Sequence, residues 1–406
     1  MQDHIHKDFV SDMQHDIHTS LPQPDALSAS HCQRVEKFIR DRIDEAGGSI
    51  SFAEFMHHSL YAPGLGYYAA GASKFGEAGD FVTAPEVSAI FGRVLARQCA
   101  EVLGQIPRGS ILEYGAGSGK LAGDILSALE TLDALPERYE ILEVSGDLKE
   151  RQEAHLCAEV PHLFSRVSWV QAVPEQHRGV IIANEVLDAL PVERFRKSKD
   201  GFEQLRVTLR DGAFAITGAP APRLLAERVE AIEGGLGEAL PVGYVSEVSL
   251  GVHEWIVTLG ESLQEGIALL FDYGVTQREY YARERSDGWL RCHFRHHVHD
   301  NPLILTGIQD LTAWVDFSAV AEAALAGGFE IAGYSAQAQF LIGGGLDLEM
   351  QEFAALPLKR QLQLSGQIKT LTLPAEMGEH FKCMALRRGA VRTPSAFSLA
   401  DRTHTL

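Results

Sequence analysis

The sequence predicts an α/β protein built on a doubly wound, mainly parallel sheet. Three observations support this fold class. From residue 111 onward, short apolar runs of strand length alternate with segments of helical pattern. Glycines occupy alternate positions of residues 115–119, between the first predicted strand and the helix that follows it. Polar and acidic residues directly follow several predicted strands, at the sheet edge where ligands of such folds bind.

The first 105 residues predict a tail and a helical cap rather than part of the sheet. Residues 1–30 contain five Asp, four His and no Arg, and we expect them to form a disordered tail. Residues 31–105 form the predicted cap region. Its helices are expected at 32–46, at 51–60 and from 79–88 onward. Thr83 and Glu86 have the spacing of a capping box at the start of the third helix.

Residues 106–390 contain the predicted sheet domain, and residues 391–406 form a C-terminal tail. The expected strands are 111–114, 139–144, 167–170, 180–184, 266–273, 340–342 and 381–386, with a helix at 318–326. Two long segments between strands read as insertions on the substrate side, at about 192–260 and 275–316. The first insertion includes a predicted hairpin, 203–209 and 213–217, which turns at Asp211-Gly212.

The bulk composition restricts the partners and the compartment. With 36 Lys and Arg against 55 Asp and Glu, the net charge of −19 argues against binding to nucleic acid. The five cysteines are far apart and odd in number, which predicts reduced thiols rather than disulfides. No apolar run approaches the roughly 18 residues of a transmembrane helix, and no targeting signal is evident. We therefore expect a bacterial cytoplasmic protein without membrane insertion.

The glycine turn is the strongest functional motif. Gly115, Gly117 and Gly119 permit positive φ angles and allow a ligand to approach the main chain closely. A Walker loop is excluded because Tyr114 replaces its first glycine and Leu121 replaces its Ser or Thr. A dinucleotide fingerprint is excluded because the third glycine comes one residue early. The remaining interpretation is a site for S-adenosylmethionine, a cofactor made of a nucleoside and an amino acid, whose enzymes have turns that this pattern closely resembles. The alternative is a glycine-rich turn that binds no ligand.

Acidic and amide side chains follow four of the predicted strands. On the cofactor side we place Glu113 beside the glycine turn and Glu143, which can accept hydrogen bonds from ribose hydroxyls. Thr83 and Asn184 are assigned to the same side. Three further carboxylates, candidates for the chemistry, are Glu185, Asp188 and Asp272. Buried carboxylates without partners are costly, so Glu185 should face a cleft or a cation. Alternatively, Asn184 or Asp188 caps a helix, and Asp272 only binds loop amides.

The histidines near residue 295 do not predict a metal site. His293, His296, His297 and His299 are interleaved with arginines, and no cysteine pair accompanies them. Their spacing matches no zinc pattern. A loop that faces the substrate, or an ordinary surface, is the expectation.

Several sequence blocks together resemble one family, the MidA-like S-adenosylmethionine-dependent methyltransferases. The blocks are 79–88, 113–119, 142–145, 184–191, 272–274, 309–317 and 377–382. Mitochondrial members of the family act as protein arginine methyltransferases in the assembly of respiratory complex I. The resemblance covers about residues 34–388 and implies a class I methyltransferase fold, Rossmann-like, with an N-terminal helical segment and inserted elements on the substrate side. The family often has Gly-Pro-Gly-Arg-Gly in the cofactor turn, where this chain has Gly-Ala-Gly-Ser-Gly, so the glycines remain.

The resemblance implies that the chain methylates an arginine side chain of a protein substrate. A carboxylate that binds the guanidinium through paired hydrogen bonds can orient it for an in-line transfer. We assign this role to Glu185, with Asp188 or Asp272 second. Two alternatives stay open: methylation of a small molecule or another protein side chain, and a non-catalytic assembly factor on the same fold. A homodimer is possible, and the sequence does not name the methyl acceptor.

Overall fold

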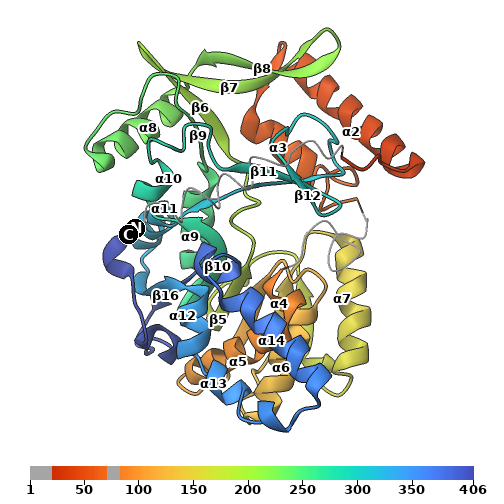
Figure 1. Cartoon of the computed structure of the whole chain (residues 1–406), viewed down its shortest axis with the longest axis vertical. Helices are drawn as coiled ribbons and strands as arrows, with labels where there is room; N and C mark the ends of the chain where they lie inside the picture. Colours follow the sequence, from red (N-terminus) through yellow and green to blue (C-terminus); the bar gives the residue numbers. More distant parts are fainter. Residues whose placement is uncertain (1–20, 71–82) are drawn as a thin grey trace.

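The structure, a computed structural model, describes residues 21–70 and 83–406. Residues 1–20 of the predicted tail, and residues 79–82 at the start of the predicted third helix, lie outside the described part. Two lobes are visible in Figure 1, a lower lobe around the wound sheet and an upper lobe around a second sheet. In the described part, no helix is both long enough and apolar enough to cross a membrane.

The lower lobe contains the predicted doubly wound sheet. Its strand order is β4-β3-β2-β5-β10-β16-β15, and β14 pairs with β10. The first five strands of this order are parallel, and β16 is antiparallel to both of its neighbours. The strands are β2 (Ser110–Tyr114), β3 (Tyr139–Leu142), β4 (Val167–Val170), β5 (His177–Asn184), β10 (Leu263–Val275), β14 (Val315–Asp316), β15 (Glu330–Ala336) and β16 (Phe381–Arg388).

Alternate residues of the sheet enter two separate cores because successive strand side chains point to opposite faces. In β5, Val180 and Ile182 belong to one core, whereas Ile181 belongs to the other. The first core is covered by α4 (Ala84–Val87), α5 (Ala89–Leu103), α6 (Lys120–Thr131), α7 (Gly146–Glu159), α12 (Gln337–Gly343), α13 (Leu346–Glu349), α14 (Leu358–Thr372) and α15 (Met377–His380). The second core is covered by α9 (Gly251–Ser262) and α11 (Phe317–Ala326).

The upper lobe joins the N-terminal helices to elements of both predicted insertions. Its main sheet has the order β1-β7-β6-β9, with β8 beside β7, and a three-stranded sheet has the order β12-β11-β13. The elements are α2 (Ala26–Glu45), β1 (Ser49–Ser51), α3 (Phe52–Tyr61), β6 (Glu193–Ser198), β7 (Gly201–Arg210), β8 (Ala213–Pro220), α8 (Arg223–Leu236), β9 (Val245–Val248), α10 (Gln277–Tyr280), β11 (Leu290–Phe294), β12 (His297–His299) and β13 (Asp310–Ala313). The predicted hairpin is β7–β8, with positive φ angles at Asp211 and Gly212.

Residues 31–105 do not form one unit, because α2 and α3 pack in the upper lobe while α5 packs on the wound sheet. The predicted long helix is interrupted at Ser88, whose extended backbone separates α4 from α5 and whose side chain caps α5. Thr83 makes no capping hydrogen bond, so the capping box predicted there is absent. A capping box does occur at Ser51 and Glu54, where α3 begins.

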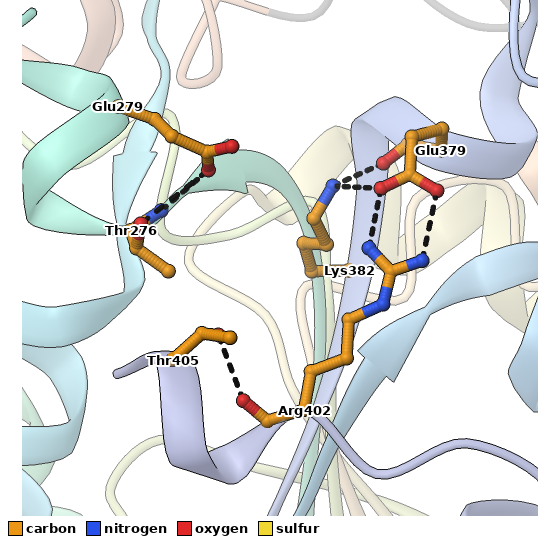
Figure 2. A network of polar contacts seen from close by, with 6 residues as sticks. All are labelled: Thr276, Glu279, Glu379, Lys382, Arg402 and Thr405. Atoms are coloured by element: carbon orange, nitrogen blue, oxygen red, sulfur yellow. Dashed lines mark hydrogen bonds and ion pairs between the residues drawn. The ribbon is translucent and has the colours of Figure 1, made fainter.

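One prediction near the C-terminus is corrected. The apolar residues 340–342 lie in helix α12, and the strand beside β16 is β15, which the sequence analysis missed. The predicted tail packs on the lower lobe: Phe397 is buried, and Arg402 Nη1 and Nη2 donate to Glu379 at 2.5 and 3.1 Å. Figure 2 shows this contact, together with Lys382, which also binds Glu379. The described residues include four short 3-10 helices, at Phe164–Arg166, Phe353–Ala355, Ser395–Ser398 and Thr403–Thr405.

Candidate active site

A cavity of about 330 Å³ lies at the carboxyl edge of the wound sheet, between the two lobes. It is bordered by the ends of β2, β3 and β5, by α4 at one side, and by Tyr61 and Tyr68 of the upper lobe. Of the ten site residues predicted from the sequence, eight line it: Thr83, Glu113, Gly115, Gly117, Glu143, Asn184, Glu185 and Asp188. Gly119 and Asp272 do not.

The glycine turn has the geometry that its sequence predicts. Gly115, Gly117 and Gly119 have φ angles of +60°, +55° and +84°, which side-chain-bearing residues rarely adopt. Gly115 N–H donates to Leu142 O at 3.0 Å, which fixes the turn against the end of β3. Gly119 is the N-cap residue of α6, so the first amides of this helix lie beside the cavity wall. The turn therefore offers main-chain atoms, rather than side chains, to a bound molecule.

Glu143 is held beside the glycine turn by a short network. Its carboxylate accepts hydrogen bonds from Ser145 N–H and from Gln152 Nε2, both at 2.9 Å. Gln152 Nε2 also donates to Gly117 O at 3.0 Å, so one side chain joins the acid to the turn. The indole Nε1 of Trp169 donates to Gln152 Oε1 at 2.8 Å, which fixes the orientation of the amide. This arrangement places a carboxylate directly after β3, at the position where a ribose binds in related folds.

Glu113 is buried beneath the turn with only 2% of its surface exposed. The hydroxyl of Tyr139 donates to its Oε2 at 2.8 Å. Burial raises the pKa of Glu113 to about 7, although the hydrogen bond from Tyr139 acts in the opposite direction. Glu113 therefore changes its charge near neutral pH, in contact with the cofactor side of the cavity.

Glu185 occupies a strained backbone position directly after β5. Its φ of +54° is uncommon for a residue other than glycine, and such strain concentrates at functional sites. Its N–H donates to Phe271 O at 2.8 Å, and Asn184 Nδ2 donates to its Oε1 at 3.1 Å. Burial, followed by the negative charge of Asp188, raises the pKa of Glu185 to about 8, against hydrogen bonds from Asn184 and the Ala84 amide.

Asp188 brings a second carboxylate to the same side of the cavity. Its Oδ1 is buried and has no hydrogen-bond partner in the described part of the chain, and the same holds for Asn184 Oδ1. Burial raises the pKa of Asp188 to about 6, against a hydrogen bond from the side chain of Tyr273. Unpartnered buried oxygens are costly, so these two atoms are suited to accept hydrogen bonds from a ligand.

Asp272 is not among the residues that line the cavity. Asp272 is fully buried, and its Oδ2 accepts hydrogen bonds from the N–H groups of Leu187 and Asp188 at 2.9 and 3.2 Å. Its Oδ1 accepts from Tyr273 N–H at 3.0 Å. The carboxylate is thus used to hold the loop after β5, which was the second interpretation of this residue. It positions Asp188 without facing the cavity.

Sequence analysis missed several residues that line the cavity. Tyr61 and Tyr68 lie in a stretch that was read only as a turn after a helix, although its density of aromatic residues was a signal. Glu86 was read as a capping residue, but its carboxylate accepts a hydrogen bond from Ser118 Oγ at 2.5 Å, which joins α4 to the glycine turn. Trp255 of α9 packs edge-on against Tyr114, and no motif marked it.

The charge of the cavity is one-sided. Five acidic residues line it, namely Glu86, Glu113, Glu143, Glu185 and Asp188, whereas the described lining residues include no Lys, Arg or His. A bare glycine turn, a carboxylate at the ribose position and an acidic wall fit S-adenosylmethionine, whose sulfonium is positively charged. The same charge fits a cationic methyl acceptor.

The histidine-rich segment is a β-hairpin of the upper lobe and does not line the cavity. His293 lies on β11 opposite Asp310 of β13, and Arg295 and His296 form the tight turn with positive φ angles. Arg295 Nη2 donates to Asp25 Oδ2 at 2.7 Å, which ties the hairpin to the N-cap residue of α2. Within residues 21–70 and 83–406, no cluster of three His, Cys, Asp or Glu side chains could hold a metal ion.

Comparison with protein families decides the class of the protein. A family model of S-adenosyl-L-methionine-dependent methyltransferases matches residues 94–335, more than half of the chain. The chain belongs to this methyltransferase family. The methyltransferase is also similar in structure to a protein of Burkholderia thailandensis that was crystallised with S-adenosyl-homocysteine, with a TM-score of 0.90 and 39% identity over 95% of this chain and 100% of the other. A second crystal structure from that organism has a TM-score of 0.88 and 38% identity, over 95% of this chain and 100% of the other.

Curated relatives of the methyltransferase include two animal proteins. The Drosophila melanogaster protein named protein arginine methyltransferase NDUFAF7 homolog, mitochondrial, is 30% identical, with 91% of this chain and 89% of the relative covered. The Mus musculus protein arginine methyltransferase NDUFAF7, mitochondrial, is 31% identical, with 84% and 81% covered. These names overturn the prediction of a bacterial cytoplasmic location, because both relatives are named as mitochondrial proteins. The predictions of the fold class, the family and the cofactor are confirmed.

Proposed function

We propose that the methyltransferase transfers a methyl group from S-adenosylmethionine to an arginine side chain of a protein. One observation carries the proposal: a single cavity joins the bare glycine turn to the carboxylates of Glu185 and Asp188, and no basic residue is among its described lining residues. An arginine side chain stays protonated at neutral pH, so a cavity lined by acidic residues favours its binding. The names of the fly and mouse relatives, which are arginine methyltransferases, support the same acceptor.

For the cofactor, we infer that the main chain of Gly115 and Gly117 contacts its amino acid part, and that Glu143 accepts hydrogen bonds from its ribose. Thr83 and Asn184 also line the cavity. Glu113 lies beneath the turn with Tyr139 as its partner. When bound, S-adenosylmethionine supplies the methyl group and leaves as S-adenosylhomocysteine.

For the acceptor, Glu185 binds the guanidinium and Asp188 provides the second carboxylate. Paired charge-assisted hydrogen bonds would orient the planar group and concentrate its charge away from the attacking nitrogen. A carbon–nitrogen bond forms as the carbon–sulfur bond breaks, and the methylated nitrogen then releases one proton. The positions of Glu185 and Asp188 are set by β10, through Phe271 O and Asp272 Oδ2. This anchoring limits the motion of the acceptor during transfer.

Radiolabelled methyl transfer into a lysate from a strain that lacks this protein tests the proposal. We expect label in a protein, with methylarginine identified by mass spectrometry of the labelled band. Glu185→Gln should reduce transfer by about 100-fold or more and leave cofactor affinity within about twofold, because the residue acts on the acceptor. Glu227→Gln, on the surface beside Arg223, is the matched control and should behave as the unchanged protein.

Other outcomes would identify the competing functions. Label in the small-molecule fraction, or on a protein residue other than arginine, would replace the proposed acceptor. Absence of label, together with co-purification of a partner by both the unchanged protein and the Glu185→Gln variant, would indicate a non-catalytic assembly factor. Full activity in the Glu185→Gln variant would reject the assigned role of this residue.

A further inference from the structure

Two tyrosines from outside the wound sheet form one wall of the cavity. Tyr61 is the last residue of α3, and Tyr68 lies in the turn that follows this helix. Their rings are stacked, with centroids 5.5 Å apart and an interplanar angle of 20°. This separation leaves no space for a further planar group between the rings, so a ligand in the cavity meets the outside of the pair.

Both hydroxyls are used to fix the rings. The hydroxyl of Tyr61 donates to Ala189 O at 2.9 Å, in the same loop as Asp188. The hydroxyl of Tyr68 donates to the carboxylate of Asp310, with distances of 3.1 and 3.0 Å to its two oxygens. Burial, together with the charge of Asp310, raises the pKa of both tyrosines well above the ordinary value. Both phenols therefore stay neutral, and neither acts as a base at physiological pH.

The rings face the same cavity as the unpartnered oxygens Asn184 Oδ1 and Asp188 Oδ1, which have no hydrogen-bond partner among the described residues. A fixed neutral π-surface together with an amide oxygen and a carboxylate oxygen is complementary to a flat cation that carries N–H groups around its edge. A guanidinium matches both features at once. An ammonium is a compact charge that is strongly hydrated, and it gains less from an aromatic wall and a row of acceptors.

We propose that Tyr61 and Tyr68, fixed by Ala189 O and Asp310, form with Asp188 the subsite that selects a guanidinium over an ammonium as the methyl acceptor. This inference rests on the proposed function, since it deepens the choice of acceptor at the same site. The wall belongs to the upper lobe, so the upper lobe determines which side chain is methylated. The lobe built on the wound sheet supplies the cofactor-binding turn and the carboxylates.

Binding measurements test this subsite without requiring turnover. The probes are N-acetyl-arginine amide and N-acetyl-lysine amide, titrated by calorimetry into the full chain saturated with S-adenosylhomocysteine. We expect the arginine amide to bind at least about tenfold more tightly than the lysine amide. Tyr61→Leu and Tyr68→Leu, which remove a ring, should weaken the arginine amide by about tenfold and leave affinity for S-adenosylhomocysteine within about twofold.

Tyr61→Phe and Tyr68→Phe keep the ring and provide the conservative comparison, and each should retain most of the affinity and the preference for arginine. Tyr244→Phe is the matched control, because its hydroxyl also donates to a main-chain carbonyl, Ala282 O, at a site that does not line the cavity. Equal binding of the two amides, no binding of the arginine amide, or unchanged affinity in both leucine variants would overturn the inference.

The proposed function can fail separately. Selective binding of the arginine amide without methyl transfer to arginine in the lysate would contradict the proposed function but would still support the guanidinium subsite. Transfer to arginine, with unchanged affinity in both leucine variants, would leave the function and remove this role for Tyr61 and Tyr68.

Discussion

Asp272 Oδ2 accepts a hydrogen bond from the main-chain N–H of Asp188 over 3.2 Å, and so one acidic residue positions another. The loop that carries Asp188 is held from three elements. Asp272 acts from β10, Tyr61 contacts Ala189 O from α3, and Ala313 N–H of β13 donates to Asp188 O at 3.0 Å. Two of these three contacts come from the upper lobe. The orientation of the carboxylates therefore depends on the packing of the two lobes against each other.

Asp272→Asn should moderately reduce both the stability and the activity of the methyltransferase. We expect the effect on activity to arise only because the loop that carries Asp188 shifts. Asparagine keeps one acceptor oxygen for the loop amides but loses the acceptor for Tyr273 N–H, so we expect a loss of about 1–3 kcal/mol of folding stability. Methyl transfer should fall by about tenfold, with cofactor affinity unchanged. Chemical denaturation, label transfer and calorimetry measure the three quantities.

Asp401→Asn is the matched control for Asp272→Asn, because Asp401 Oδ1 likewise accepts two main-chain N–H groups, from Tyr334 and Thr403, at 3.1 and 3.0 Å. This variant should lose stability but retain methyl transfer. A loss of activity in Asp272→Asn as large as that of Glu185→Gln, without any loss of stability, would instead indicate that Asp272 contacts the substrate.

The strands and the cofactor edge could be predicted because each depends on local sequence. Runs such as Val180–Ile182 are apolar enough to predict a buried strand, and the glycines of the turn determine its backbone. The exchange of strand and helix near residue 340 shows the limit of this approach. Phe340 and Leu341 are buried in α12, and a short buried apolar run reads alike as strand or helix.

The tyrosine wall of the cavity could not be predicted, because it is held by contacts between segments distant in sequence. Tyr68 is 242 positions from Asp310, its hydrogen-bond partner, and Tyr61 is 128 positions from Ala189. No local pattern reports such a contact. The choice between the two interpretations of Asp272 stayed open for a related reason: its place at the end of a strand was evident, but the direction of its carboxylate depends on the path of a neighbouring loop.

Gly117→Val should abolish cofactor binding. The φ of +55° at this position is strongly unfavourable for a β-branched residue, so the turn must change its path. Calorimetric titration with S-adenosylhomocysteine should show at least about 100-fold weaker binding. Gly366→Val is the control, since Gly366 lies in α14 without a positive φ angle, and a β-carbon added there would meet no atom within 4 Å. An unaltered titration for Gly117→Val would count against the turn as the cofactor seat.

Glu113→Gln should make folding stability less sensitive to pH. The pKa of Glu113 is raised from 4.5 to about 7 in the folded protein, so the unfolded chain releases this proton first. The stabilisation from the neutral acid is complete below pH 4.5 and is lost as the pH rises through 7, a change of about 3 kcal/mol. The glutamine side chain does not titrate and still accepts the hydrogen bond from Tyr139. Thermal unfolding should show that the stability of the variant, relative to that of the unchanged protein, increases between pH 5 and pH 8.

Binding of a cationic acceptor should strengthen as the pH rises from 6 to above 8. In the free protein, the pKa of Asp188 is raised to about 6 and that of Glu185 to about 8, so both carboxyls hold protons at low pH. A guanidinium requires the ionised carboxylates, and its binding therefore releases protons, up to about one per carboxyl. Titrations of N-acetyl-arginine amide across this range should show an affinity that rises with pH. In the Glu185→Gln variant, the affinity for the arginine amide should stop rising near pH 6 to 7, because only Asp188 still titrates there. The affinity for S-adenosylhomocysteine, measured at each pH, is the internal reference. An affinity that falls with pH, or a Glu185→Gln variant with an unchanged profile, would mean that the acceptor does not bind against these carboxylates.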